Sequence, residues 1–289
     1  MSESPHIALR NPVPFSESIA DYPEGIILPI DKPYRWTSAD VIRKVKFAAI
    51  RHFHKKNLKV GHAGTLDPLA TGVLLVCIGA ATKQAEELQR HDKEYVAGIS
   101  FGATTPSYDL EKEIDRLYPY DQVTEEAITA VLPSFLGEQE QVAPLFSAKS
   151  VDGVRAYELA RRAYREAARE GVAFDHADAD LLTRQRIRID EIELLAFSPD
   201  GIPASNRPQE MGASSRIHVT DNSALRLPHA DIRIACSKGT YIRAFARDLG
   251  EALGTGAHLD ALCRTRTGGF RIEDALTLDQ ALQLLQSPS

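Results

Sequence analysis

The chain has 289 residues, of which 43% are hydrophobic and 26% charged, and its formal net charge is −6 at pH 7. These values are typical of a globular protein with a substantial core, and they exclude a disordered chain and a protein that coats nucleic acid through overall positive charge. Three widely spaced cysteines without a CxxC pair exclude a disulfide framework and indicate reduced thiols in the cytoplasm. We expect no membrane span, because no apolar run reaches about 20 residues. We also expect no signal peptide, because the first residues lack a cationic start followed by an apolar run.

The first third of the chain predicts an extended arm, two strands and a helix. Residues 1–23 carry four prolines and are expected to form the arm. The apolar runs Ile26–Ile30 and Val73–Ile78 predict buried strands. The Thr37-Ser38 pair is a candidate cap for a helix over 39–52, whose apolar residues recur at helical spacing. The residues expected on its buried face are Val41, Val45, Ala48 and Ala49.

The rest of the chain mixes strand and helix patterns without the regular alternation of a doubly wound fold. Lys93–Phe101 alternates, which places Tyr95, Ala97 and Ile99 on one strand face with Phe101. We therefore expect an α+β fold. The further elements are predicted helices over Glu125–Leu132, Arg155–Glu170 and Tyr241–Leu253, predicted strands over Arg184–Phe197, Arg216–Thr220 and Ala230–Cys236, and a Gly/Pro/Ser-rich insertion over Ser198–Ser214.

One acidic residue, Asp67, stands in a glycine-rich loop that runs from Gly61 to Gly72. Because Pro68 follows it, Asp67 is a candidate N-cap of a single helical turn that Gly72 ends. Capping alone is one interpretation. A catalytic carboxylate is the other, since glycines let a backbone and a ligand approach closely. In the same loop, His62 fits a turn residue, a wedge against a nucleobase or a general base.

A strongly basic segment precedes this loop. It holds eight lysines or arginines and one acidic residue, Asp40, between Arg35 and His62. Because the whole chain is acidic, this local concentration of positive charge favours an enzyme that holds a polyanion while it acts on one small part of it.

Arg243 lies in the first turn of the helix predicted over Tyr241–Leu253, where a cation opposes the helix dipole. It has no acidic residue at i±3 or i±4, whereas Arg247 has Glu251. We therefore expect a distant anionic partner for Arg243, in a structural ion pair or in a functional site. Tyr95, by its strand pattern alone, is expected to be a core aromatic residue.

Five segments carry a resemblance to a known family. They are Gly25–Ser38, Val60–Gly79, Lys93–Gly102, Pro144–Arg161 and Ser237–Leu262. Taken in this order, they resemble the bacterial TruB family of tRNA pseudouridine-55 synthases. The loop GHAGTLDPLATG is highly specific, and its occurrence together with KGTYIR makes chance similarity implausible.

The resemblance implies a pseudouridine synthase fold, with a mixed or antiparallel central sheet and an RNA-binding cleft, and it implies a role for each candidate residue. Asp67 falls on the family's catalytic aspartate, Tyr95 on the tyrosine that stacks on the flipped base, and Arg243 on the arginine that pairs with the aspartate. His62 matches the histidine that fills the gap left by the flipped uridine. The residues that match pocket-shaping positions are Lys32, Tyr241 and Leu262.

The activity that the resemblance implies is isomerisation of uridine-55 in the TΨC loop of tRNA to pseudouridine. The base must leave its stack before the C–N bond breaks and C5 bonds to C1′. This reaction requires no redox cofactor and no metal. We expect a monomer with no obligatory protein partner and no membrane contact. Phosphate contacts are expected from Arg43, Lys44, Lys46, Lys55, Lys56 and Lys59.

Several alternatives stay open at this point. The chain could catalyse the same chemistry on another RNA, or serve as an RNA-binding module that folds tRNA. Nucleophilic attack at C1′ and abstraction of the 2′ proton both require a carboxylate at Asp67. Tyr95 is expected either to take the C5 proton or only to stack.

The sequence departs from the family pattern in three places, of which Leu145-Phe146, where Met-Tyr is usual, is a conservative change in packing. The segment Thr105–Lys112 keeps Asp109 but lacks the first acidic residue and the glycine of the family's TDTxDxxG. Only 22 residues follow Thr267, too few for the small PUA-like RNA-binding domain that many members carry. We therefore expect one catalytic domain over 24–289.

Overall fold

The computed structural model describes residues 5–9, 14–144, 184–201 and 217–286, together with 150, 151, 154, 155 and 169. The chain divides into two compact units. The first consists of Met1–Tyr95, Pro208–Ile217 and Cys263–Ser289, and the second of Val96–Arg207 and His218–Leu262. No helix in the described part of the chain is long and apolar enough to cross a membrane.

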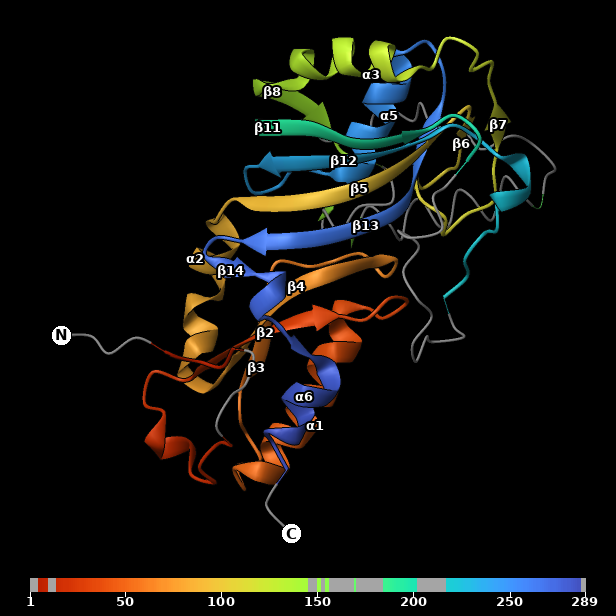
Figure 1. The fold of residues 1–289 in the computed structure, drawn as a ribbon. Coiled ribbons are helices and arrows are strands. Elements are labelled where there is room, and N and C mark those ends of the chain that lie inside the picture. Colours follow the sequence, from red (N-terminus) through yellow and green to blue (C-terminus); the bar gives the residue numbers. More distant parts are fainter. Residues whose placement is uncertain are drawn as a thin grey trace. The chain divides into compact units, whose positions relative to one another are not determined.

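The first unit is built on strands that follow the order β1-β2-β4-β13 (Figure 1). Antiparallel β2 and β4 pair from Ile26↔Ile78 to Lys32↔Gly72. The buried run predicted over Val73–Ile78 is confirmed, because all six side chains are fully buried in β4. The strands are β1 (His6–Ile7), β2 (Ile26–Lys32), β3 (Val60–Ala63), β4 (Ala70–Ile78), β13 (Ala257–Thr267), β14 (Phe270–Arg271) and β15 (Leu276–Thr277).

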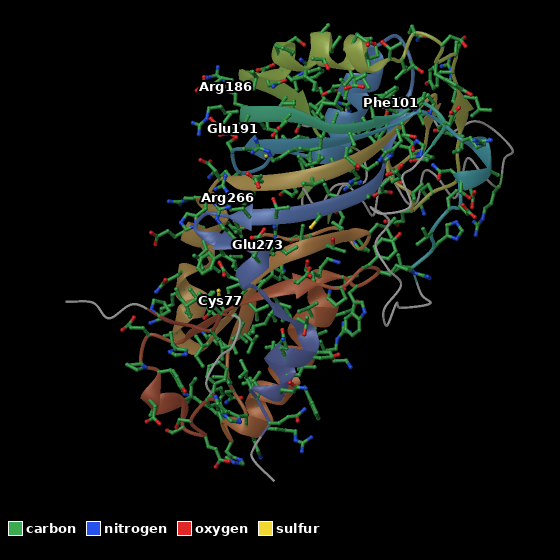
Figure 2. All side chains as sticks on the ribbon, in the orientation of Figure 1. Cys77, Phe101, Arg186, Glu191, Arg266 and Glu273 are labelled. Atoms are coloured by element: carbon green, nitrogen blue, oxygen red, sulfur yellow. The ribbon has the colours of Figure 1, made fainter. Side chains whose placement is uncertain are left out.

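The described part of this unit contains the α-helices α1 (Ser38–His52), α2 (Ala85–Arg90) and α6 (Leu278–Gln283). The predicted first helix is confirmed. Thr37 is its N-cap and forms a capping box with Asp40. Its buried face holds three of the four predicted residues, and Ala48 is only partly buried. Cys77 of β4, which is labelled in Figure 2, belongs to a cluster of buried side chains that also holds Ile27, Ala63, Val73, Leu75, Ala81 and Leu88.

The strand order that involves the second unit is β13-β5-β12-β11-β8, and β5 and β13 each have residues in both units. The strands predicted over Lys93–Phe101, Arg184–Phe197 and Ala230–Cys236 and the helices near 125 and 242 are confirmed, within one residue at most ends. The sheet is mixed, because β2 pairs in parallel with β1 and β15, whereas β11 pairs antiparallel with β12 and β8. The α+β expectation is therefore confirmed. The elements are β5 (Lys93–Phe101), β6 (Ala103–Thr104), β7 (Arg116–Leu117), α3 (Glu125–Val131), β8 (Gly137–Val142), β11 (Arg184–Ser198), β12 (His229–Cys236) and α5 (Ile242–Ala252).

One predicted strand is wrong, and one predicted helix cannot be compared in full. Residues 217–220 form no strand, because Thr220 N donates to the loop carbonyl of Leu110 at 2.8 Å and not to a neighbouring strand. Nearly all of the helix predicted over Arg155–Glu170 lies outside the described residues, as does 202–214 of the insertion. Arg155, the first residue of the predicted helix, is not helical, because it ends the short strand β10 (Val154–Arg155).

A buried charged cluster lies in the second unit, where β5, β12 and β13 each contribute a side chain. His229 places Nδ1 2.9 Å from Asp260 Oδ2 and Nε2 3.1 Å from Asp231 Oδ1. Ser100 Oγ donates to the same Asp260 oxygen at 2.5 Å. Burial disfavours the charged imidazole, but the two carboxylates together outweigh burial and raise the pKa of His229 to about 9.

We predict that the His229 imidazole carries a proton on both nitrogens at neutral pH and loses one near pH 9. Because this pKa lies above the unfolded value of about 6.5, the stabilisation is fully present below that pH and is lost as the pH rises through about 9. An NMR titration of ¹⁵N-labelled histidine measures the pKa, and His229→Gln assigns the signal. A His229 pKa below about 7 would contradict the prediction.

Candidate active site

The loop around Asp67 differs from the single helical turn that the sequence predicts. Asp67 and Pro68 occupy the first two positions of a β-turn, which Ala70 N closes by donating to Asp67 O at 3.1 Å. A helix N-terminus and a β-turn have the same residue preferences here, because a β-turn also favours Asp at its first position and Pro at its second. Gly72 does not end a helix. It lies within β4 at φ 97°, so the expected capping role of Asp67 is wrong.

The buried guanidinium of Arg264 fixes this loop. Arg264 is 2% exposed and donates Nε to Val73 O at 2.8 Å and Nη2 to Gly64 O at 3.0 Å. Its Nη1 lies 3.4 Å from Thr65 O. A Cβ at Gly72 would lie 2.2 Å from Arg264 O, so only glycine fits where β4 meets β13. The backbone on both sides of Asp67 is therefore held by one side chain.

The loop is also tied to α1. Ser38, the first residue of that helix, donates Oγ to Leu66 O and accepts from Leu66 N, both at 3.0 Å. Leu66 directly precedes Asp67 in the chain. The carboxylate is half-buried, and its backbone is bonded on both sides to regular structure.

Lys32 places a buried cation beside this turn. It is fully buried, and its Nζ donates to the carbonyls of Trp36 at 2.6 Å, Pro33 at 2.9 Å and Pro68 at 3.2 Å. Burial lowers the pKa of Lys32 to about 7, and the nearby Asp67 carboxylate opposes that shift. The Lys32 ammonium and the Asp67 carboxylate therefore stabilise each other's charge.

Two other candidates in the first unit, His62 and Tyr95, are partly and largely buried, respectively. His62, on β3, is half-buried, and burial followed by the positive charge of Arg264 lowers its pKa. At neutral pH its imidazole is therefore uncharged. Tyr95 is 8% exposed in β5, an environment that fits a core residue and also a ring at the floor of a site. The six predicted phosphate-binding cations, from Arg43 to Lys59, are all exposed.

In the second unit, Arg243 has the distant anionic partner that its helix position predicts. Its side chain is buried in the first turn of α5 and places Nε 3.7 Å from Asp109 Oδ2. Nη1 donates to Ser107 O at 3.1 Å. Asp109 was not among the sequence candidates, although it is the acidic residue that the altered loop retains. Whether Arg243 also pairs with Asp67 stays a prediction.

The loop between β6 and β7 holds Asp109 in place. Ser107 Oγ donates to Asp109 Oδ1 at 2.6 Å, and the backbone N of Glu111 donates to the same oxygen at 2.9 Å. At the N-terminus of α5, Gln141 binds both the N and the O of Tyr241. Leu262, half-buried in β13, completes the candidates in this unit.

Two family models together match residues 51–287, which include Asp67, Tyr95 and Arg243. The model of the TruB family pseudouridylate synthase N-terminal domain matches residues 51–242. The chain belongs to the TruB family. A second model, the tRNA pseudouridylate synthase B C-terminal domain, matches residues 243–287. As a member of this family, the chain is a pseudouridine synthase.

Two relatives named tRNA pseudouridine synthase B align over nearly their full length. That of Phocaeicola vulgatus is 46% identical over 259 residues, which are 90% of this chain and 92% of the relative. That of Bacteroides thetaiotaomicron is 48% identical over 256 residues, covering 89% and 91%.

Solved structures of more distant proteins share the fold. The crystal structure of a Cbf5-Nop10-Gar1 complex matches with a TM-score of 0.55 at 26% identity, over 90% of this chain and 54% of that one. An H/ACA RNP bound to a substrate RNA matches with a TM-score of 0.53 at 24% identity, over 90% of this chain. This chain spans about half the length of the matched chains.

We predict that Gly72→Ala destabilises the protein by at least about 2 kcal/mol, because a Cβ at φ 97° is strained and meets the Arg264 backbone. Urea unfolding measures the change. Gly61→Ala is the matched control, since a Cβ there meets nothing within 4 Å and is expected to change stability by less than about 0.5 kcal/mol. Equal stability of the two variants would contradict the fixed geometry of the loop.

Proposed function

We propose that the chain isomerises uridine-55 in the TΨC loop of tRNA to pseudouridine, with Asp67 as the catalytic carboxylate. The observation that carries this proposal is the half-buried carboxylate on a rigid turn, beside the buried Lys32 ammonium. Family membership and the names of the relatives support the reaction type and tRNA as the substrate. The enzyme acts in the cytoplasm as a monomer.

The reaction needs a carboxylate that is ionised and correctly oriented. Asp67 acts on the ribose, either at C1′ or at the 2′ proton, so that the C1′–N1 bond breaks. The freed uracil turns, C5 bonds to C1′, and the C5 proton leaves. Every atom of the uridine except exchanged protons stays in the product, so Asp67 and its fixed surroundings can carry the reaction by orientation and charge.

Lys32 and Arg264 hold the loop of Asp67 in place through hydrogen bonds to its backbone carbonyls. Lys32 donates to Pro68 O, one residue from Asp67, and the Asp67 carboxylate opposes the fall in the Lys32 pKa that burial causes. Arg264 keeps the turn in one conformation before substrate arrives. A preorganised site of this kind avoids the cost of rearranging its dipoles during the reaction.

Tyr95, His62 and the exposed cations of the first unit bind the RNA. Tyr95 offers an aromatic surface for the flipped base, and base–aromatic stacking contributes roughly 1–3 kcal/mol. The uncharged His62 suits the gap that the base leaves, because a neutral planar ring stacks without a buried charge. The exposed cations between Arg43 and Lys59 contact phosphates.

We predict that Asp67→Asn abolishes tritium release from 5-tritiated uridine in tRNA while tRNA affinity stays within about threefold, because the amide keeps the shape but neither attacks nor accepts a proton. Asp190→Asn, which removes an exposed carboxylate on β11, is the control and should keep full activity. Retained turnover in Asp67→Asn would contradict the assignment. Modification of a bare TΨC stem-loop by wild-type protein tests the substrate, and its absence would favour another RNA.

We also predict that Asp109→Asn lowers kcat at least about tenfold and leaves tRNA affinity nearly unchanged, because Arg243 loses the anion that orients its guanidinium. Single-turnover kinetics separates the two effects. The control is Asp248→Asn, which removes the partly buried acidic partner of Arg247 on the same helix. Equal losses in the two variants would indicate a general disturbance of α5.

A further inference from the structure

The outer face of α1 combines exposed cations with an exposed aromatic ring. Phe47 is 66% exposed, the highest value among the large hydrophobic side chains in the described part of the chain. Arg43, Lys44 and Arg51 are exposed as well. Residues at these spacings share one face of a helix, opposite the buried face that includes Val45. An aromatic ring therefore lies in the middle of a positively charged surface.

Two of these cations lie against aromatic rings. The Arg51 guanidinium is 5.8 Å from the centroid of the Phe47 ring, and Lys44 Nζ is 5.5 Å from that of Trp36. Both are cation–π distances. These contacts limit the motion of the cations, and the high exposure of Phe47 leaves much of its ring open to a ligand.

The position of this face along α1 is fixed relative to the loop of Asp67. Ser38 begins the helix and is bonded to Leu66, next to Asp67. Phe47 follows nine residues later, which is about 13 Å along the helix axis at roughly 1.5 Å per residue. A ligand on Phe47 is thus separate from the group that reacts at Asp67, but an RNA chain readily spans this distance.

We propose that this α1 face stacks an unpaired base of the RNA substrate, other than the target uridine, on Phe47, while Arg43, Lys44 and Arg51 contact the neighbouring phosphates. The inference rests on the proposed function for the class of substrate. Cations match phosphates, and an open aromatic ring matches the π-face that every base has. A protein partner fits less well, because charged residues are depleted at the core of protein–protein interfaces, and three cations surround this ring.

The test measures the affinity of unmodified tRNA transcript in the Asp67→Asn background, at several salt concentrations. Phe47→Ala and Phe47→Leu each weaken binding roughly tenfold, since both remove the ring, whereas Phe47→Tyr stays within about twofold. The slope of log Kd against log salt is unchanged in all three, because no charge is lost. Lys44→Gln instead lowers that slope by about one.

Leu117→Ala is the matched control, because it removes another exposed apolar side chain, 62% exposed, in the second unit. It should leave binding unchanged. Wild-type affinity in Phe47→Ala or in Phe47→Leu overturns the proposal, as does altered sedimentation with unchanged RNA affinity, which would indicate a protein contact. The readout needs no turnover, so its failure is distinct from failure of the isomerase assay.

Discussion

The buried guanidinium of Arg264 is the constraint on which the geometry of the first unit depends. A charged group with five donors is stable at 2% exposure only when oxygen atoms receive its hydrogen bonds. Those oxygens are the backbone carbonyls of Gly64, Thr65 and Val73, on both sides of Asp67. The loop cannot relax without leaving a buried charge unsatisfied, so the position of the carboxylate is set by the cost of losing these bonds.

Lys32 is a second buried cation near Arg264, so this region needs negative charge to compensate two positive side chains. Lys32 and Arg264 repel each other, and the Arg264 charge is one of the causes that lower the pKa of Lys32. Asp67 and Asp31 supply the compensating negative charge. Gly72 N donates to Asp31 Oδ1 at 3.0 Å, which joins this carboxylate to the same strand end. The charge of Asp67 therefore has a structural partner as well as the proposed catalytic role, and an isosteric amide is the least disruptive way to remove it.

Much of the fold follows from local pattern, whereas the contacts that build the site do not. Buried strands such as Val73–Ile78 and the amphipathic helix after Tyr241 have periodicities that identify them. The Asp67-Pro68 pair was misassigned because a helix N-terminus and a β-turn favour the same two residues. Arg264 reaches carbonyls about 190–200 residues away in the chain, and no local signal marks such contacts. For Arg243, helix electrostatics predicted a distant anion, but only the structure identifies Asp109.

The distribution of charge explains how an acidic chain can present an RNA-binding surface. On β11, three arginines that include Arg186 are followed by three carboxylates that include Glu191, so the strand has little net charge (both residues are labelled in Figure 2). Arg233 of the neighbouring strand β12 forms ion pairs with Glu191 and Glu193, and these pairs neutralise much of the Arg233 charge. On α1 the described ion pair is Arg43 with Asp40, while Lys44 and Arg51 lie over aromatic rings, which do not cancel their charge. For the proposed RNA substrate, phosphates are therefore expected at α1 and not at β11, where the net charge is small, so the arrangement of charges, and not their total, favours one face.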